Sequence, residues 1–223
     1  MPTYEQLGFG QGAALTGDRA RAVFGQVMGL VTFALGFAAL GAYVARDAHT
    51  SGFLFFIGAF ACIFGLQAAA ARGREQLAIG LLFGMALLLG MAISPIVVYY
   101  AKSDPGVVYE AAGSTALFVG ALGSFGYATR RDLSRYQKPF WILFGVAFVF
   151  GLIAMFVAIP NSNIIYCVAM LIAFGGFTVF DFNRLANGGQ YFGAVPIAAS
   201  IFLDIFNVFI LLLSLFGGGS QRR

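Results

Sequence analysis

The stretch YFGAVPIAASIFLDIFNVFILLLSLF, residues 191–216, is a hydrophobic segment whose one acidic residue is Asp204. It is longer than the roughly 20 residues that an α-helix needs to cross a bilayer at about 1.5 Å per residue. An ionisable side chain at membrane depth costs at least about 2.5 kcal/mol, so it is interpreted first as a functional site with a partner. The segment therefore predicts a membrane-spanning helix built around a functional carboxylate.

Six further hydrophobic stretches of similar length precede this segment. Of the 223 residues, 60% are hydrophobic and 10% are charged, and the mean hydropathy is +0.88, which is typical of a membrane protein. We predict an all-α, polytopic helical bundle with seven transmembrane helices as one domain, 23–216, between an N-terminal cytoplasmic segment, 1–22, and a short polar tail, 217–223. The predicted spans are 23–45, 52–71, 76–100, 107–129, 139–159, 163–185 and 191–216.

The basic residues predict the orientation, because cytoplasmic loops carry an excess of Lys and Arg. With the N-terminus in the cytoplasm, the opposite loops hold only Arg46 and Lys102. The cytoplasmic side collects Arg19, Arg21, Arg72, Arg74, Arg130, Arg131, Arg135, Lys138 and Arg184. Seven crossings would place Arg222 and Arg223 outside, against the same rule, so a re-entrant last segment stays open as an alternative.

A second aspartate, Asp181, lies near the end of the sixth predicted span. Residues 187–190, Asn-Gly-Gly-Gln, predict a turn, and Pro196 is suited to the first turn of the seventh helix. The helical rise then places Asp181 about 6–9 Å from the cytoplasmic end of its helix, and Asp204 about 12 Å from the end of its own. These depths are close enough for the two carboxylates to pair.

Polar neighbours accompany both aspartates. Asn207 lies three residues after Asp204, and Arg184 lies three residues after Asp181, so each shares a helix face with its aspartate. A simple interfacial role for Asp181 and a helix-to-helix hydrogen bond for Asp204 are the plainer alternatives. Because residues 202–209 are polar only at Asp204 and Asn207, we expect this carboxylate to face protein or water instead of lipid.

Glycines recur three or four residues apart within the predicted spans. Such spacing lets helix backbones approach closely, which we expect to be their role here, with pore lining as the alternative. Pro95, late in the third span, predicts a kink or a break in that helix. The glycines in the first and fourth spans include Gly25, Gly29, Gly36, Gly41, Gly113, Gly120, Gly123 and Gly126.

Four short stretches occur in order along the chain. They are Gly113-Ser114-Thr115-Ala116, Thr129-Arg130-Arg131-Asp132-Leu133-Ser134, Phe180-Asp181-Phe182-Asn183 and Phe202-Leu203-Asp204-Ile205-Phe206-Asn207-Val208-Phe209. Together with seven spans, they resemble the Bax inhibitor-1 family, the transmembrane Bax-inhibitor-motif proteins. The resemblance covers nearly the whole chain. It implies a bundle with the last helix at its centre and, for bacterial members, a pH-sensitive calcium leak channel.

The resemblance also implies roles for particular residues. Asp181 and Asp204 match a pair that acts as a pH sensor and gate beside the pore. Arg72, matched through its spacing to Pro95, would act as a latch by bonding to one of the two carboxylates. One departure is that residues 52–71 contain no acidic residue, whereas some members carry one in that span.

The chemistry of these residue types agrees with such a role. Two carboxylates held close in a low-dielectric site do not both ionise easily, and such a pair can titrate near neutral pH. Protonation would also weaken the charge-assisted bond to Arg72. Calcium takes about six to eight oxygen ligands, so Asp181 and Asp204, supported by Asn207, Asn183 or water, predict a partial and transient site suited to passage.

The same residues are compatible with other functions. The main alternative is a membrane regulatory protein that binds a membrane protease or another membrane partner without conducting ions. A proton-coupled transporter lacks support, because the chain has no clear inverted repeat. A serine protease would need a histidine beside Ser124, yet the one histidine, His49, lies in the first external loop.

No phosphate-binding loop or organic-cofactor motif is present, so we expect a non-enzyme whose ligands are calcium and protons. The formal net charge of +4 indicates membrane lipid as a contact, and not nucleic acid. Compact loops and the lack of a retention signal favour a bacterial inner membrane, with the N-terminus in the cytoplasm.

Overall fold

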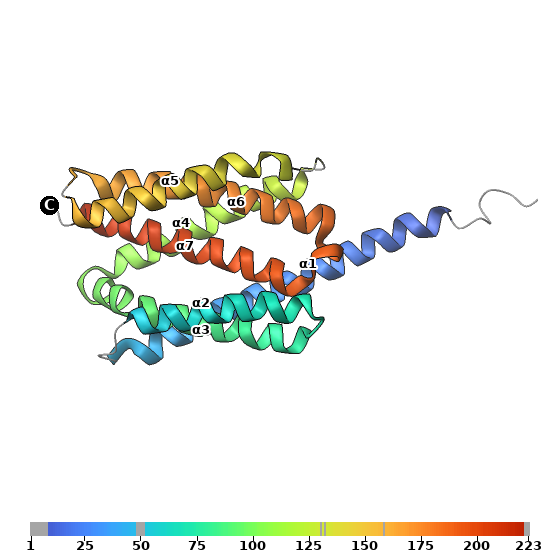
Figure 1. Ribbon diagram of the computed structural model, residues 1–223, viewed down its shortest axis with the longest axis horizontal. Helices are drawn as coiled ribbons and strands as arrows, with labels where there is room; N and C mark the ends of the chain where they lie inside the picture. Colours follow the sequence, from blue (N-terminus) through green and yellow to red (C-terminus); the bar gives the residue numbers. More distant parts are fainter. Residues whose placement is uncertain (1–8, 48–51, 130, 132, 158, 221–223) are drawn as a thin grey trace, which may run out of the picture.

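The computed structural model describes residues 9–47, 52–129, 131, 133–157 and 159–220, and their regular structure is helical (Figure 1). Seven of the helices are long and apolar enough to cross a membrane, which confirms the predicted bundle. The elements are α1 (Phe9–Val44), η2 (Ala45–Asp47), α2 (Gly52–Ala71), α3 (Glu75–Ser103), α4 (Pro105–Ala128), η3 (Ser134–Tyr136), α5 (Gln137–Phe156), α6 (Ser162–Phe192) and α7 (Ala194–Ser220).

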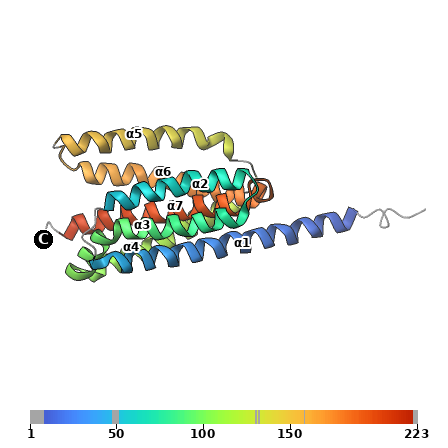
Figure 2. The ribbon, with the colours of Figure 1, turned by 60° about the horizontal axis from the view of Figure 1, so that its bottom comes forward.

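The helices form two groups that share α7. In the first group α3 packs against α1 and α2, and in the second α6 packs against α4 and α5. Helix α7 contacts α1, α2 and α3 on one side and α4 and α6 on the other. Figure 2 shows α5 as the outermost helix of its group, lying over α6. Residues on α7 are therefore placed to touch both groups.

Burial differs sharply among the spans. Half of the span residues of α6 and of α7 are buried, against 6% for α5. The exposed residues of α5 are large and apolar, for example Trp141 and Phe156. In a bilayer such a face is covered by acyl chains at no desolvation cost, whereas polar groups must lie inside the bundle. The buried helices α6 and α7 are thus where polar chemistry is expected.

Helix α6 is longer than the sequence predicts. It continues through residues 187–190 to Phe192 and ends at Gly193, whose φ of +77° suits glycine. The predicted turn at 187–190 is therefore wrong, because a glycine within a helix costs only about 1 kcal/mol and two of them did not stop this one. Pro196 lies in the first turn of α7, as predicted.

The first and the last helix both reach beyond their predicted bounds, α1 at its start and α7 at its end. Helix α1 begins at Phe9, well before residue 23, although its candidate span is Arg21–Asp47. Helix α7 is continuous, with a candidate span of 25 residues, Ala194–Gly218. A re-entrant segment needs a break to turn back, and α7 has none, so its geometry favours a full crossing. In Figure 1, α7 ends at the opposite end of the bundle from its connection to α6.

Helix α3 runs through Pro95 without a break, so of the two sequence-based alternatives the break is wrong. Next to the proline, the Ser94 hydroxyl donates a 2.7 Å hydrogen bond to the Ala42 carbonyl on α1. This bond gives the buried hydroxyl an acceptor and ties the late part of α3 to α1.

Three glycines bring helix backbones into close contact, as their spacing predicts. A Cβ on Gly90 would meet the backbone of Ala38, and one on Gly41 would lie 3.1 Å from the backbone nitrogen of Met91. On α4, a Cβ on Gly126 would meet the backbone of α6. Other glycines, Gly25, Gly29, Gly36, Gly113 and Gly120, have nothing within 4 Å of such a Cβ, so packing does not explain them.

Substitution Gly90→Leu is expected to lower the thermal stability of the detergent-solubilised protein by about 1–3 kcal/mol or more, because its Cβ would meet backbone that no rotamer change can move. Thermal unfolding followed by circular dichroism measures this loss. Gly80→Leu, on the same helix with nothing within 4 Å, is the matched control. Equal melting temperatures for the two variants would contradict close packing of α1 and α3.

Candidate functional site

Two carboxylates lie inside the bundle. Asp181 on α6 is 7% exposed, and Asp204 on α7 is 5% exposed. They are close enough to interact electrostatically across the α6–α7 contact. The structure thus brings together the two residues that the sequence singled out.

The depths of the two carboxylates match. Asp181 lies 11 residues before the end of α6 at Phe192, and Asp204 lies 10 residues after the start of α7 at Ala194. At 1.5 Å per residue these are about 16 and 15 Å. Asp181 is therefore deeper than the predicted 6–9 Å, because α6 continues beyond the predicted turn.

Two hydroxyls lie near the carboxylates, each on the helix opposite the carboxylate that it approaches. Ser200 of α7 lies within hydrogen-bonding reach of Asp181, and Thr178 of α6 lies within reach of Asp204. Each hydroxyl also has a carbonyl of its own helix within bonding distance, at 3.1 Å for Ser200 and 2.9 Å for Thr178. Neither residue was predicted, although each lies one helical turn before an aspartate, the spacing that places residues on one face.

In the part of the chain that the structure describes, one carboxylate oxygen of the pair, Oδ2 of Asp204, is buried without a hydrogen bond. Leaving a buried polar atom unsatisfied is costly, typically about 1–3 kcal/mol and more for a charged group. This oxygen is chemically suited to hold a proton or to contact a cation.

The two predicted basic partners differ in their distance from the carboxylates: Arg184 acts on Asp181, whereas Arg72, in the described part of the chain, does not contact the pair. Arg184, one turn after Asp181, acts on it electrostatically, as its spacing suggests. Arg72 is exposed in the turn between α2 and α3. Among the described residues no hydrogen bond or ion pair joins Arg72 to either aspartate, so the latch is not formed in this conformation. Its role stays a prediction.

Asn183 has a structural task. Its Oδ1 accepts a 3.1 Å hydrogen bond from the Leu133 backbone N–H. Its Nδ2 lies within hydrogen-bonding distance of the carbonyls of Gly126, Thr129 and Arg131, at 3.2, 2.8 and 3.0 Å. These carbonyls belong to the end of α4 and the loop after it, which need partners beyond the helix. The amide of Asn183 is therefore engaged with backbone in this conformation, and its support of the aspartates stays a prediction.

The amide nitrogen of Asn207 is engaged within its own helix. Its Nδ2 donates a 2.7 Å hydrogen bond to the Leu203 carbonyl of its own helix, and the side chain is half-buried. Among the residues described, there is no group of three or more His, Cys, Asp and Glu side chains that could hold a metal ion. The two carboxylates and the two nearby hydroxyls thus supply oxygens at the site.

Apolar layers enclose the pair along α7. On one side of Asp204 lie Ile201 and Phe202, each 0% exposed. On the other side Val208 and Leu213 are 0% exposed and Leu211 is 5% exposed. The first two residues belong to the core shared with α1 and α3, and the last three to the core shared with α5 and α6. The pair therefore lies between two apolar layers along α7.

A seven-helix bundle with buried carboxylates at membrane depth defines a polytopic helical membrane protein. The family model described as "Inhibitor of apoptosis-promoting Bax1" matches residues 20–222. The chain therefore belongs to the Bax inhibitor-1 family, as the resemblance implied.

Bacterial relatives support this assignment. A protein of Lactococcus lactis named YrjE is 32% identical over 189 residues, which covers 78% of this chain and 77% of the relative. A membrane protein of Streptococcus pyogenes is 32% identical over 160 residues, 68% of each chain. A protein of Helicobacter pylori is 29% identical over 170 residues, 76% of this chain and 73% of its own.

Substitution Asn183→Ala is expected to destabilise the protein by about 1–3 kcal/mol, because it removes the amide that binds the end of α4 and its loop. Thermal unfolding in detergent measures the change. Asn207→Ala is the matched control, since that amide bonds only within its own helix among the contacts described. A loss for Asn183→Ala no larger than for the control would contradict this role.

Proposed function

We propose that this protein is a pH-sensitive calcium leak channel whose gate is the pair Asp181 and Asp204. The observation that carries the proposal is the burial of two neighbouring carboxylates, 7% and 5% exposed, at matched depth between α6 and α7. Ionisable residues inside a membrane bundle mark ion or proton pathways by default. The family assignment is consistent with the proposal.

The apolar layers on α7 support a gating role. Ile201 and Phe202 on one side of Asp204 and Val208 on the other are fully buried apolar side chains of α7. Hydrophobic constrictions close ion pathways because water does not remain in them. The conformation described here is then the closed one, and opening requires α6 and α7 to separate enough for water and ions to reach the carboxylates.

The direction of the pH response follows from charge. Two like charges close together in a low-dielectric site repel strongly, so the packed pair favours the state in which one of the two carboxyl groups carries a proton. Loss of that proton drives the helices apart. Because the closed conformation binds more protons than the open one, it is favoured at low pH and loses stability as the pH rises through the titration of the pair.

Calcium would meet a partial site once the pair opens. Asp181 and Asp204 provide carboxylate oxygens, including Oδ2 of Asp204, and Ser200 and Thr178 provide hydroxyls close by. Calcium prefers six to eight oxygen ligands, so water must complete the shell. A loose shell allows the ion to leave again, which conduction requires.

The proposal predicts that purified protein in liposomes with an entrapped calcium dye admits calcium faster as the pH rises from about 5.5 to about 8. A switch that releases one proton changes the open-to-closed ratio by at most about tenfold per pH unit. Asp181→Asn and Asp204→Asn each remove one of the two charges whose repulsion opens the pair, so both variants are expected to give low flux that does not change with pH.

Asp47→Asn is the matched control, because Asp47 is an exposed carboxylate paired with Arg46 at the surface. It should keep the pH response of the unchanged protein. If the folded protein gives no flux above that of empty liposomes at any pH, the channel proposal fails. The alternative of a regulatory protein that binds a membrane partner would then be favoured.

Arg72→Gln tests whether the latch contributes to gating. If Arg72 bonded a carboxylate in the closed state, acid would break that bond and open the channel, which is the opposite pH response. Since Arg72 is exposed and makes no contact with the pair in the described residues, we expect Arg72→Gln to leave the flux–pH curve unchanged. A shift of the curve in the same liposome assay would show that the latch forms.

A further inference from the structure

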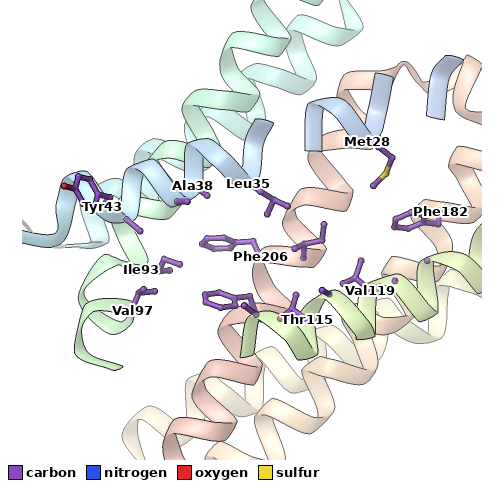
Figure 3. Close-up of a pocket in the computed structure, with 18 of the residues that line it drawn as sticks. Met28, Leu35, Ala38, Tyr43, Ile93, Val97, Thr115, Val119, Phe182 and Phe206 are labelled. Atoms are coloured by element: carbon purple, nitrogen blue, oxygen red, sulfur yellow. The ribbon is translucent and has the colours of Figure 1, made fainter. Parts of the chain in front are cut away.

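A long apolar groove of about 940 Å³ lies between α1 and α4 (Figure 3). Leu35 and Ala38 of α1 form one wall, and Val119 of α4 forms the other. Phe206 of α7 and Ile93 of α3 point into the space between the walls. The volume is near the top of the range of roughly 300–1,000 Å³ for sites that bind small molecules.

The groove has one closed end and one open end. At the closed end the rings of Phe24 on α1 and Tyr127 on α4 meet, with their centroids 4.9 Å apart. At the other end the lining includes Tyr43 and Arg46. From Phe24 to Tyr43 the helical rise gives about 28 Å, close to the roughly 30 Å thickness of the hydrocarbon core. The groove thus runs through the depth of the bilayer.

The shape and chemistry of the groove fit a flexible apolar chain. The α4 wall includes Ala112, Ala116 and Gly120, which are exposed and small, so the groove is accessible from the side. A transmembrane helix is about 10–12 Å wide and rigid, and the joined rings of Phe24 and Tyr127 would stop it from lying along the whole groove. A lipid acyl chain is thinner and flexible, so it can lie along the groove beside these rings.

The open end carries a group suited to a phosphate. The Arg46 guanidinium lies 4.2 Å from the centre of the Tyr43 ring, and its Nε donates a 3.0 Å hydrogen bond to Asp47 Oδ2. Its side chain is 48% exposed at the end of the membrane-spanning segment. The terminal nitrogens of a guanidinium bind phosphate oxygens in pairs, and aromatic residues such as Tyr43 favour the head-group level.

We propose that the groove is a binding site for one anionic phospholipid. Its phosphate binds Arg46, and one acyl chain lies against Phe206 and Phe209 of α7. The smaller apolar cavity between α4, α5 and α6, about 530 Å³, includes no charged residue in its lining and is not part of the proposal.

The groove is lined in part by residues that adjoin the carboxylate pair in the chain. Phe182 and Ile205 line the groove and are the residues that follow Asp181 and Asp204 in the chain. A bound chain therefore contacts the same turns of α6 and α7 that hold the carboxylates. Lipid binding itself does not depend on ion conduction, so it is tested separately.

The test is native mass spectrometry of the purified, delipidated protein after addition of phosphatidylglycerol or phosphatidylcholine. We expect one tightly retained phosphatidylglycerol per chain. Gly120→Trp places a large side chain in the groove and should lower retention about tenfold, whereas Gly80→Trp should not change it. Both glycines are exposed and have nothing within 4 Å of an added Cβ, so each substitution fits the fold.

Arg46→Gln tests the head-group contact. A basic residue near a membrane surface contributes about fivefold to the binding of an anionic lipid, so this variant should lose about fivefold for phosphatidylglycerol and nothing for phosphatidylcholine. Arg74→Gln is the control. Arg74 is an exposed cation just before the start of α3 and is not part of the groove lining, so this variant should keep the preference for phosphatidylglycerol.

Three results would overturn the proposal. The first is equal retention of lipid by the unchanged protein and by Gly120→Trp. The second is no preference for phosphatidylglycerol over phosphatidylcholine in the unchanged protein. The third is a second copy of the chain retained in place of lipid and lost only in Gly120→Trp, which would assign the groove to a helix.

Discussion

The rest of the structure depends on the placement of two carboxylates inside a membrane bundle. A charge in hydrocarbon is costly, so Asp181 and Asp204 must face each other, polar side chains or a proton, and not lipid. The structure meets this requirement with the crosswise hydroxyls of Ser200 and Thr178 and with the nearby charge of Arg184. Helices α6 and α7 are consequently the most buried spans, and helix α5, whose exposed side chains include large apolar ones, is the least.

Close helix packing holds that pair in position. Without a hydrophobic force between helices in lipid, contact depends on van der Waals packing and on small residues. Gly41 and Gly90 join α1 to α3, and Gly126 joins α4 to α6, so each group of helices is packed around backbone contacts. Asn183 secures the second group by binding the end of α4 from α6. Helix α7 then packs against both groups, with its carboxylate on the α6 side.

Helices α6 and α7 contribute residues both to the carboxylate pair and to the groove. One surface of α6 and α7 holds the carboxylates, and the adjoining surface, with Phe182 and Phe206, lines the groove between α1 and α4. The residues of both surfaces share the same helical turns. A change in the angle between α6 and α7 would therefore alter both the distance between the carboxylates and the shape of the groove. The proposed gate and the proposed lipid site are physically coupled for this reason.

The seven spans and the two aspartates were predictable from the amino-acid sequence, because length, hydropathy and the cost of an intramembrane charge are properties of each segment alone. Pro196 was predictable in the first turn of α7, because a helix tolerates proline there. Features that depend on neighbouring helices needed the folded structure: the extension of α6 past two glycines, the partners of Asn183, the placement of Thr178 and Ser200, and the position of Arg72 outside the pair. Periodicity shows which residues share a helix face, but the packing of the other helices decides what each face meets.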